Sequence, residues 1–141
     1  MLRGELWWVD FGPTIGSEIH KRRPAVIVSN DAANRHASRV QVIPITSNVA
    51  KLYPCDASLA VEGRAARAMA DQLMTVSKNR LRGRIGAVSK SEMRAVESAL
   101  RVQLALFFDA PAENGRPGPR ATGGLKPVAR SVPVRPKEIL P

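Results

Sequence analysis

Short runs of apolar and β-branched residues, separated by polar turns, fill most of the first 88 positions and predict a small β-sheet. We expect a first strand over 6–11, which is rich in aromatic and β-branched residues. The run 25–28 is apolar at every position, so it should be a central strand buried on both faces. A third strand is predicted over 39–46, and Pro44 should mark an edge or a bulge because proline cannot donate to a ladder.

The middle of the chain predicts a hairpin. Its arms are 57–61 and 68–72, joined across 62–64, and residues 73–76 extend the second arm. A last short strand is expected over 85–88.

The clearest element is a helix that follows this sheet. Ser89 and Glu92 have the spacing of a capping box, in which each residue satisfies a free N–H near the start of a helix. Apolar residues then recur at Met93, Val96, Leu100, Leu104 and Phe107, so the helix should run to about residue 108. Together these elements predict a mainly β fold, a small antiparallel barrel with one C-terminal helix.

Composition changes sharply after residue 108. Of the 11 prolines and 10 glycines in the chain, 7 prolines and 4 glycines lie in 109–141, with almost no apolar pattern. The sequence therefore predicts one domain over 1–108 and a basic, Pro/Gly-rich flexible tail over 109–141.

Charge and cysteine content narrow the classes of protein. The 22 Lys and Arg residues exceed the 12 Asp and Glu residues, a net charge of +10, which favours a polyanionic partner or simple solubility. Cys55 is the only cysteine, so the chain has no intrachain disulfide, and a reducing, cytoplasmic location is expected. No stretch approaches the roughly 20 apolar residues of a membrane span.

The first candidate for chemistry is Arg23, directly before Pro24. A residue before proline is held in an extended conformation, so Arg23 should sit at the rigid start of the central strand. Its planar guanidinium suits phosphate oxygens. The alternative is an ordinary solvated arginine, which we prefer for Arg22.

Two other polar groups stand at predicted strand ends. Thr46, Ser47 and Asn48 follow the third strand, and Asp71 with Gln72 closes the hairpin arm. Both have an alternative reading, because such residues commonly terminate strands.

Several kinds of catalytic machinery are missing. The chain has no phosphate-binding glycine loop and no metal-binding His or Cys spacing, and His20 and His36 are its two histidines. We therefore expect no metal and no cofactor. RNA can be cut without one, because its 2′-OH attacks the adjacent phosphate when the ribose is oriented and the developing charge is stabilised.

Six short segments of the sequence resemble the MazF/PemK toxins, endoribonucleases of bacterial toxin–antitoxin pairs. The matching segments are 3–7, 9–13, 16–18, 23–30, 44–47 and 71–72. The resemblance implies a CcdB/MazF-like, SH3-like barrel that forms a homodimer, cuts single-stranded RNA at specific sequences to halt translation, and is neutralised by a cognate antitoxin. It also implies products with a 2′,3′-cyclic phosphate and a 5′-OH.

The resemblance assigns roles residue by residue. Arg23 and Thr46 would act on the scissile phosphate, and Glu18 would recognise a base or handle a proton. The remaining candidates would bind RNA: Ser17, His20, Lys21, Ser47, Asn48, Asp71 and Gln72.

The chain also departs from part of the family. The branch that uses an acid at the place of Asp71 has histidine where this chain has Ser17 and arginine where it has Met69. The full acid–base assignment of that branch therefore cannot be copied, and His20 is an alternative base. Two other functions stay open: a CcdB-like gyrase-binding toxin, disfavoured because the helix end lacks tryptophan, and a non-catalytic RNA-binding barrel.

Overall fold

The computed structural model describes residues 1–12 and 21–107. Residues Met1–Gln103 form one compact unit, and a second unit begins at Leu104. The predicted tail, 109–141, lies outside the described residues, so the domain boundary at 108 stays a prediction.

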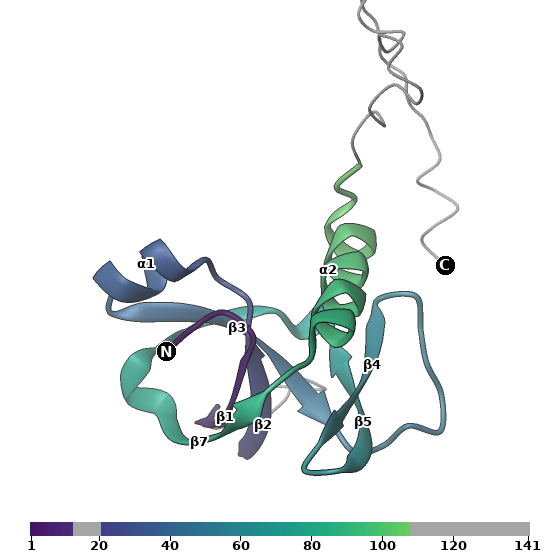
Figure 1. Cartoon of the computed structure of the whole chain (residues 1–141), viewed down its shortest axis with the longest axis horizontal. Helices are drawn as coiled ribbons and strands as arrows, with labels where there is room; N and C mark the ends of the chain where they lie inside the picture. Colours follow the sequence, from purple (N-terminus) through teal and green to yellow (C-terminus); the bar gives the residue numbers. More distant parts are fainter. Residues whose placement is uncertain (13–20, 108–141) are drawn as a thin grey trace, which may run out of the picture. The chain divides into compact units, whose positions relative to one another are not determined.

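The elements are β1 (Glu5–Asp10), β2 (Arg22–Ile27), α1 (Asp31–His36), β3 (Arg39–Thr46), β4 (Asp56–Val61), β5 (Arg64–Met69), the 3₁₀ turn η1 (Ala70–Gln72), β6 (Met74–Ser77), the 3₁₀ turn η2 (Lys78–Arg80), β7 (Leu81–Ala87) and α2 (Lys90–Leu104). All described strand pairs are antiparallel, and they form a curled sheet with α2 beside it (Figure 1). The strand order is β4-β5-β3-β2-β1-β7, and β6 pairs with β3. This confirms the predicted mainly β fold with a C-terminal helix.

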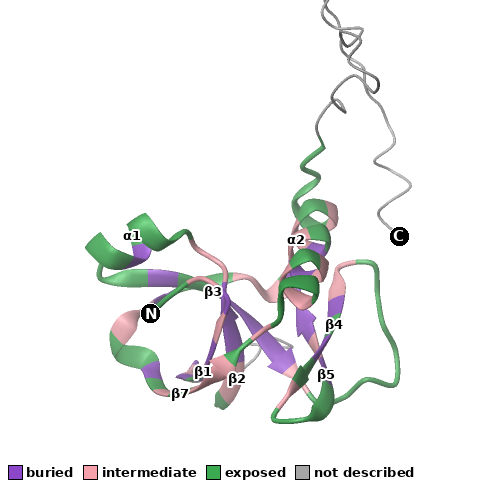
Figure 2. Ribbon diagram, in the orientation of Figure 1, coloured by how far each residue is buried: buried purple, intermediate pink, exposed green. Residues whose placement is uncertain are grey.

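The central strands are buried on both faces, as the run 25–28 predicted (Figure 2). Ala25, Val26 and Ile27 have no exposed surface. Val26 packs in one apolar cluster together with Val96 of α2. Its neighbours Ala25 and Ile27 point the other way, into a second cluster with residues of β1, β3 and β6. Alternate residues of one strand therefore serve two cores.

Pro44 lies on a central strand, so the predicted edge is wrong, and its pairing with Ala25 of β2 shows no bulge either. The backbone of Gln41 faces β2, because its carbonyl accepts the N–H of Val28. By alternation, Pro44 faces the other side of β3. There the pairing with β6 ends at Val42 and the pairing with β5 begins at Ile45. Pro44 thus lies between the two segments of β3 that pair with β6 and β5. Because no strand pairs with β3 on this side of Pro44, the missing N–H breaks no hydrogen bond of the sheet.

The hairpin has a tighter turn than predicted, and its second arm lies earlier in the chain. Glu62 and Gly63 both have positive φ, 52° and 79°, the pattern of a two-residue type I′ turn. The second arm starts at once with β5 and ends at Met69. The next residues form η1, and 73–76 does not extend the arm, because β6 pairs with β3 instead.

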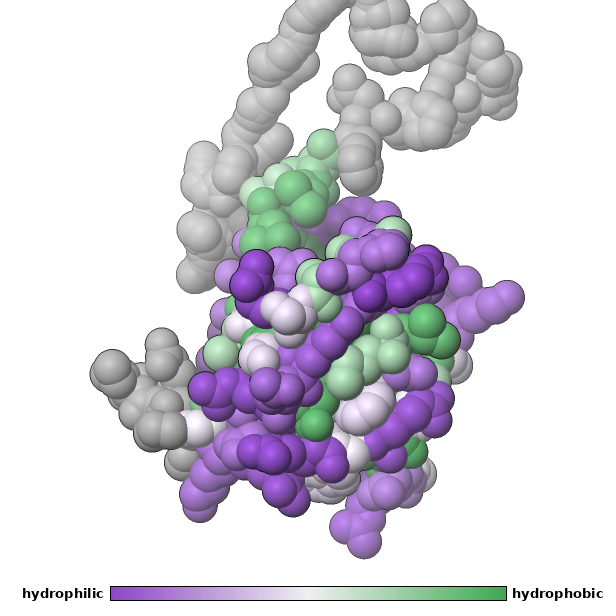
Figure 3. All heavy atoms as spheres, turned by 90° about the vertical axis from the view of Figure 1, so that its left-hand side faces the viewer, coloured by the Kyte–Doolittle hydropathy of each residue, from purple (hydrophilic) through white to green (hydrophobic). Residues whose placement is uncertain are grey.

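Strand β7 begins at Leu81, four residues before the predicted strand. The start of this strand shows no hydrophobic pattern, because Arg82 and Arg84 stand at alternate positions. Each of these arginines pairs with an acid on β1: Arg82 lies 3.7 Å from Asp10 and Arg84 lies 3.2 Å from Glu5. Burial alone would raise the pKa of Glu5, but hydrogen bonds from Trp7, Leu2 and Arg84 outweigh it and the pKa is lowered. The face that carries α1 and β7 is mostly hydrophilic (Figure 3).

The short helix α1 was not predicted. Asn30 caps it by accepting the N–H of Ala33 at 2.8 Å. Six residues are too few to show a helical period, so only this cap marked it in the sequence. None of the helices within 1–12 and 21–107 has the length and apolar content of a membrane span.

Helix α2 begins as predicted and ends earlier. Ser89 N–H donates to Glu92 Oε1 at 2.8 Å, and Glu92 N–H donates to Ser89 Oγ at 3.1 Å, which is a reciprocal capping box. The helix stops at Leu104, and Ala105 has a φ of 56°, so Phe107 is not helical. Glu92 Oε2 also accepts the N–H of Ala60 on the edge strand β4, at 2.9 Å.

Replacing Glu92 should therefore lower the free energy of unfolding by more than the loss of a helix cap alone. Glu92→Ala removes the capping box and leaves the edge N–H of Ala60 to water, so we expect about 1–2 kcal/mol lower unfolding free energy in urea titration. Arg94→Ala, at an exposed position of the same helix, is the control and should change it by less than about 0.5 kcal/mol. Equal losses in the two variants would show that Glu92 contributes only helix propensity.

Candidate active site

Arg23 lies where the sequence placed it, at the start of the central strand β2 and opposite Val9 of β1. Its guanidinium Nε is buried and has no hydrogen-bond partner among the described residues. A buried donor without an acceptor is costly. A negatively charged ligand oxygen is the acceptor that would satisfy it best.

A pocket of about 300 Å³ opens beside Arg23. Its walls come from the end of β1, the start of β2, the end of β3 and the β4–β5 hairpin. The lining residues are Trp8, Lys21, Arg22, Arg23, Pro24, Ile45, Ser47, Val61, Glu62, Arg64, Ala65 and Ala66. Four of these are cations and only Glu62 is acidic, so the pocket attracts anions.

Lys21 lines this pocket and has an unusual backbone conformation. Its φ is 69°, and its N–H and carbonyl bond to Gly12 and Phe11 at 3.2 and 2.9 Å. These bonds close the stem of the segment 13–20. Ser17, Glu18 and His20 belong to that segment and lie outside the described residues.

The polar residues at the end of β3 form a hydrogen-bonded turn, and one of them lines the pocket of Arg23. Thr46 Oγ1 accepts the N–H of Asn48 at 3.2 Å, and Asn48 Oδ1 accepts the N–H of Ala50 at 3.1 Å. Ser47 lines the pocket, whereas Thr46 and Asn48 do not. Thr46 is half-buried, at the end of the strand that forms one pocket wall.

Comparison with known proteins identifies the family of this chain. Residues 2–104 match the sequence profile of the family described as PemK-like, MazF-like toxin of type II toxin–antitoxin system. The chain belongs to this family. Endoribonuclease MazF9 of Mycobacterium tuberculosis is 40% identical over 116 residues, covering 76% of this chain and 98% of that protein. Endoribonuclease toxin MazF of Escherichia coli is 35% identical over 101 residues, covering 70% and 89%.

Solved structures show the same fold as this PemK/MazF-family toxin. A mycobacterial endoribonuclease in complex with its cognate antitoxin has a TM-score of 0.66 at 27% identity, with 77% of this chain and 98% of that chain covered. MazF from Deinococcus radiodurans has a TM-score of 0.67 at 28% identity, with 75% and 97% covered.

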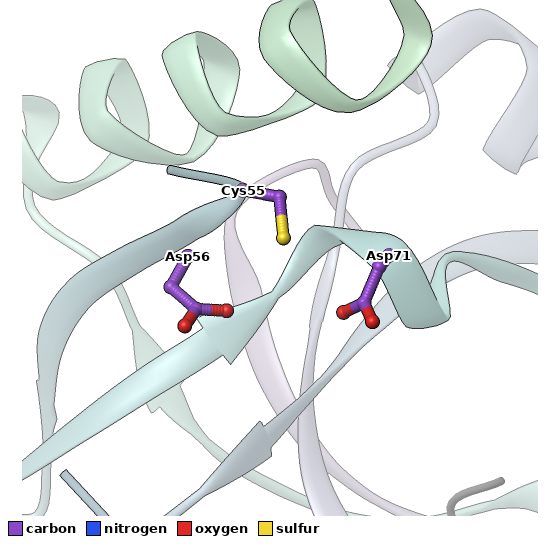
Figure 4. Close-up of side chains that lie close together, drawn as sticks. All are labelled: Cys55, Asp56 and Asp71. Carbon is purple, nitrogen blue, oxygen red and sulfur yellow. The ribbon is translucent and has the colours of Figure 1, made fainter. Parts of the chain in front are cut away.

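Asp71 and Gln72 of the toxin lie in η1 rather than at the end of a strand, and neither lines the pocket. The exposed carboxylate of Asp71 instead approaches Cys55 and Asp56 (Figure 4). The donor atoms of these three residues lie within 4.8 Å of one another. Asp56 already forms an ion pair with Arg67. Burial, and then the charges of Asp71 and Asp56, raise the pKa of the Cys55 thiol, which disfavours the thiolate that a metal would need.

Sequence reasoning missed several pocket residues, namely Trp8, Glu62 and Arg64, and gave Arg22 only a surface role. They come from separate segments that meet only in the folded toxin. The Glu62-Gly63 turn was the available signal, because it brings the start of β5 back along β4.

The raised pKa of Cys55 can be tested by alkylation. Only the thiolate reacts, so the pH at which iodoacetamide labelling reaches half its maximal rate should lie above that of a free cysteine. Asp71→Asn removes a neighbouring negative charge and should move this midpoint to lower pH. Asp31→Asn, on α1, is the control for the loss of one charge. An unchanged midpoint in Asp71→Asn would contradict the electrostatic contribution.

Proposed function

We propose that this toxin is an endoribonuclease that cuts single-stranded RNA in the pocket beside Arg23. The observation that carries the proposal is the buried Nε of Arg23, which has no acceptor within 1–12 and 21–107, in a pocket with three further cations. An RNA phosphate supplies the missing acceptor and the opposite charge. Membership of a family whose relatives are named endoribonucleases supports the same activity.

The reaction uses the nucleophile of the substrate itself. The ribose 2′-OH attacks the adjacent phosphorus and loses its proton, and the bond to the 5′-oxygen breaks as that oxygen gains a proton. The products are a 2′,3′-cyclic phosphate and a free 5′-OH. Arg23 stabilises the negative charge that grows on the phosphate oxygens in this transition state.

Thr46 completes the contact with the phosphate. A hydroxyl has one hydrogen to donate and two lone pairs. Thr46 Oγ1 accepts the N–H of Asn48, and its own hydrogen has no acceptor among the described residues, so it can be donated to a phosphate oxygen. Glu18 is proposed to recognise a base or to move a proton, and His20 is the alternative base.

The other proposed contacts hold the RNA. Lys21 and Ser47 line the pocket itself. Trp8, 37% exposed in the same wall, offers a ring on which a base can stack. The proposed RNA contacts away from the described pocket lining are Ser17, Asn48, Asp71 and Gln72. The ribonuclease domain is proposed to span 1–108, and the basic tail 109–141 adds salt-dependent contacts with phosphates.

Partners and location follow from this activity. We propose that cutting mRNA halts translation and growth, and that a cognate antitoxin binds and neutralises the toxin. The mycobacterial endoribonuclease of similar fold is in complex with its cognate antitoxin. We propose a homodimer that acts in the cytoplasm, where mRNA is translated. Gyrase binding and RNA binding without catalysis are the alternatives from the sequence, and no observation on the described residues favours either.

The chemistry predicts products that can be read directly. A long RNA incubated with the toxin in EDTA should be cut as fast as in magnesium, because the 2′-OH needs no metal-bound water. The new ends should be 5′-OH and cyclic phosphate, detected by kinase labelling and mass spectrometry. Ends with a 5′-phosphate, or cleavage that chelation abolishes and magnesium restores, would rule out this mechanism.

Arg23 should be required for turnover and not for folding. Arg23→Ala should lower kcat about 10²-fold or more, because it removes a preorganised charge donor. Arg23→Lys should restore little, because an ammonium lacks the planar fork. Arg94→Ala, which removes an equal charge from α2, is the control. Near-normal cleavage by Arg23→Lys would mean that charge alone suffices.

A further inference from the structure

The turn after β3 is tied to the sheet by a buried ion pair. Arg67 of β5 lies opposite Thr46 in the register, and its side chain is only 14% exposed. Its Nε donates to the carbonyl of Asn48 at 2.7 Å, and its Nη1 lies 2.8 Å from Oδ2 of Asp56. Arg67 therefore links the turn 46–48 to the start of β4.

The side chain of Asp56, which pairs with Arg67, is itself held in place. Its carboxylate is 1% exposed and also accepts the N–H of Tyr53 at 2.8 Å, while the N–H of Asp56 donates to the Tyr53 carbonyl at 2.9 Å. A carboxylate held by two donors inside the protein has little freedom. The rigid guanidinium bound to it is held equally well.

The link continues from Arg67 to the hydroxyl of Thr46 through the backbone of Asn48. The carbonyl of Asn48 accepts from Arg67, and its N–H donates to Thr46 Oγ1. Because that N–H occupies one lone pair of the hydroxyl, it decides where the remaining hydrogen can point. A shift of Asn48 would turn the hydroxyl.

We propose that Arg67 is a positioning residue for RNA cleavage, holding Asn48 so that the hydroxyl of Thr46 points at the scissile phosphate. The proposal rests on the proposed function, in which Thr46 contacts that phosphate. Stability alone does not account for the pair, because well-packed apolar residues can often replace a buried ion pair without loss. The specific contribution of Arg67 is its second bond, to Asn48.

The experiment separates positioning from stability. Arg67→Met removes the bond to Asn48 and also strands the buried charge of Asp56, so it should lower both stability and kcat. Adding Asp56→Asn or Asp56→Leu removes that charge and should recover the melting temperature, and two neutral partners are used in case one fails to fold. Arg94→Met, on the exposed side of α2, is the matched control for losing an arginine.

The expected result is a split between the kinetic constants. In the stability-matched double variants, kcat should stay about tenfold below wild type, while KM changes less than about twofold, because the pocket cations are intact. Recovery of kcat together with the melting temperature would overturn the proposal and make Arg67 purely structural. So would an unchanged kcat in Arg67→Met.

Two further measurements separate this proposal from the one on which it rests. If the wild-type toxin cuts no RNA, the proposed function fails. If it cuts RNA and Thr46→Val leaves kcat unchanged, the role given to Thr46 fails, and the positioning role of Arg67 fails with it. If Thr46→Val is impaired while the double variants match wild type, only the role of Arg67 is wrong.

Discussion

Burial of β2 and β3 on both faces is the constraint on which the toxin is built. Consecutive residues Ala25, Val26 and Ile27 are completely buried although their side chains point in opposite directions. Each face must therefore be covered: α2 packs on one, and β1, β3 and β6 enclose the other. A strand fixed from both sides cannot shift, so its ends are rigid points. Arg23 stands at one such end and Thr46 at another.

The pocket departs from the rules that the rest of the chain follows. In the rest of the described residues, buried polar side chains are paired, as Asp56 is with Arg67 and Asn34 is with Ser29. Among the described residues of the pocket, four cations gather around one acid, the Nε of Arg23 has no acceptor, and Lys21 has a positive φ that is rare for a residue with a side chain. Such local conflicts cost stability and are typical of binding sites. In the proposed function, an RNA phosphate supplies both the opposite charge and the missing hydrogen-bond acceptor.

The elements that the sequence predicted well are those whose signal is local. The strand over 39–46 matches β3 in both bounds, and the capping box of Ser89 and Glu92 forms as expected. The errors in the predicted strands arise where residues far apart in the sequence decide which strands pair. The arginines of β7 pair with acids of β1, and β6 leaves the hairpin to pair with β3. The predicted helix ran past Leu104 because the helical spacing of apolar residues continues to Phe107. The backbone leaves the helical conformation at Ala105.

For the site, the sequence alone determined the place of Arg23 at the start of a buried strand, because the following proline and the apolar run restrict its backbone whatever residues surround it. It also marked the polar end of the third strand, because Thr46 and its neighbours follow an apolar run directly. Only the tertiary structure decided which residues surround Arg23, that Asp71 faces Cys55 instead, and that Arg67 reaches Asn48 and Asp56 at once. Contacts of this kind depend on strand register and on side chains from distant segments, which no local pattern records.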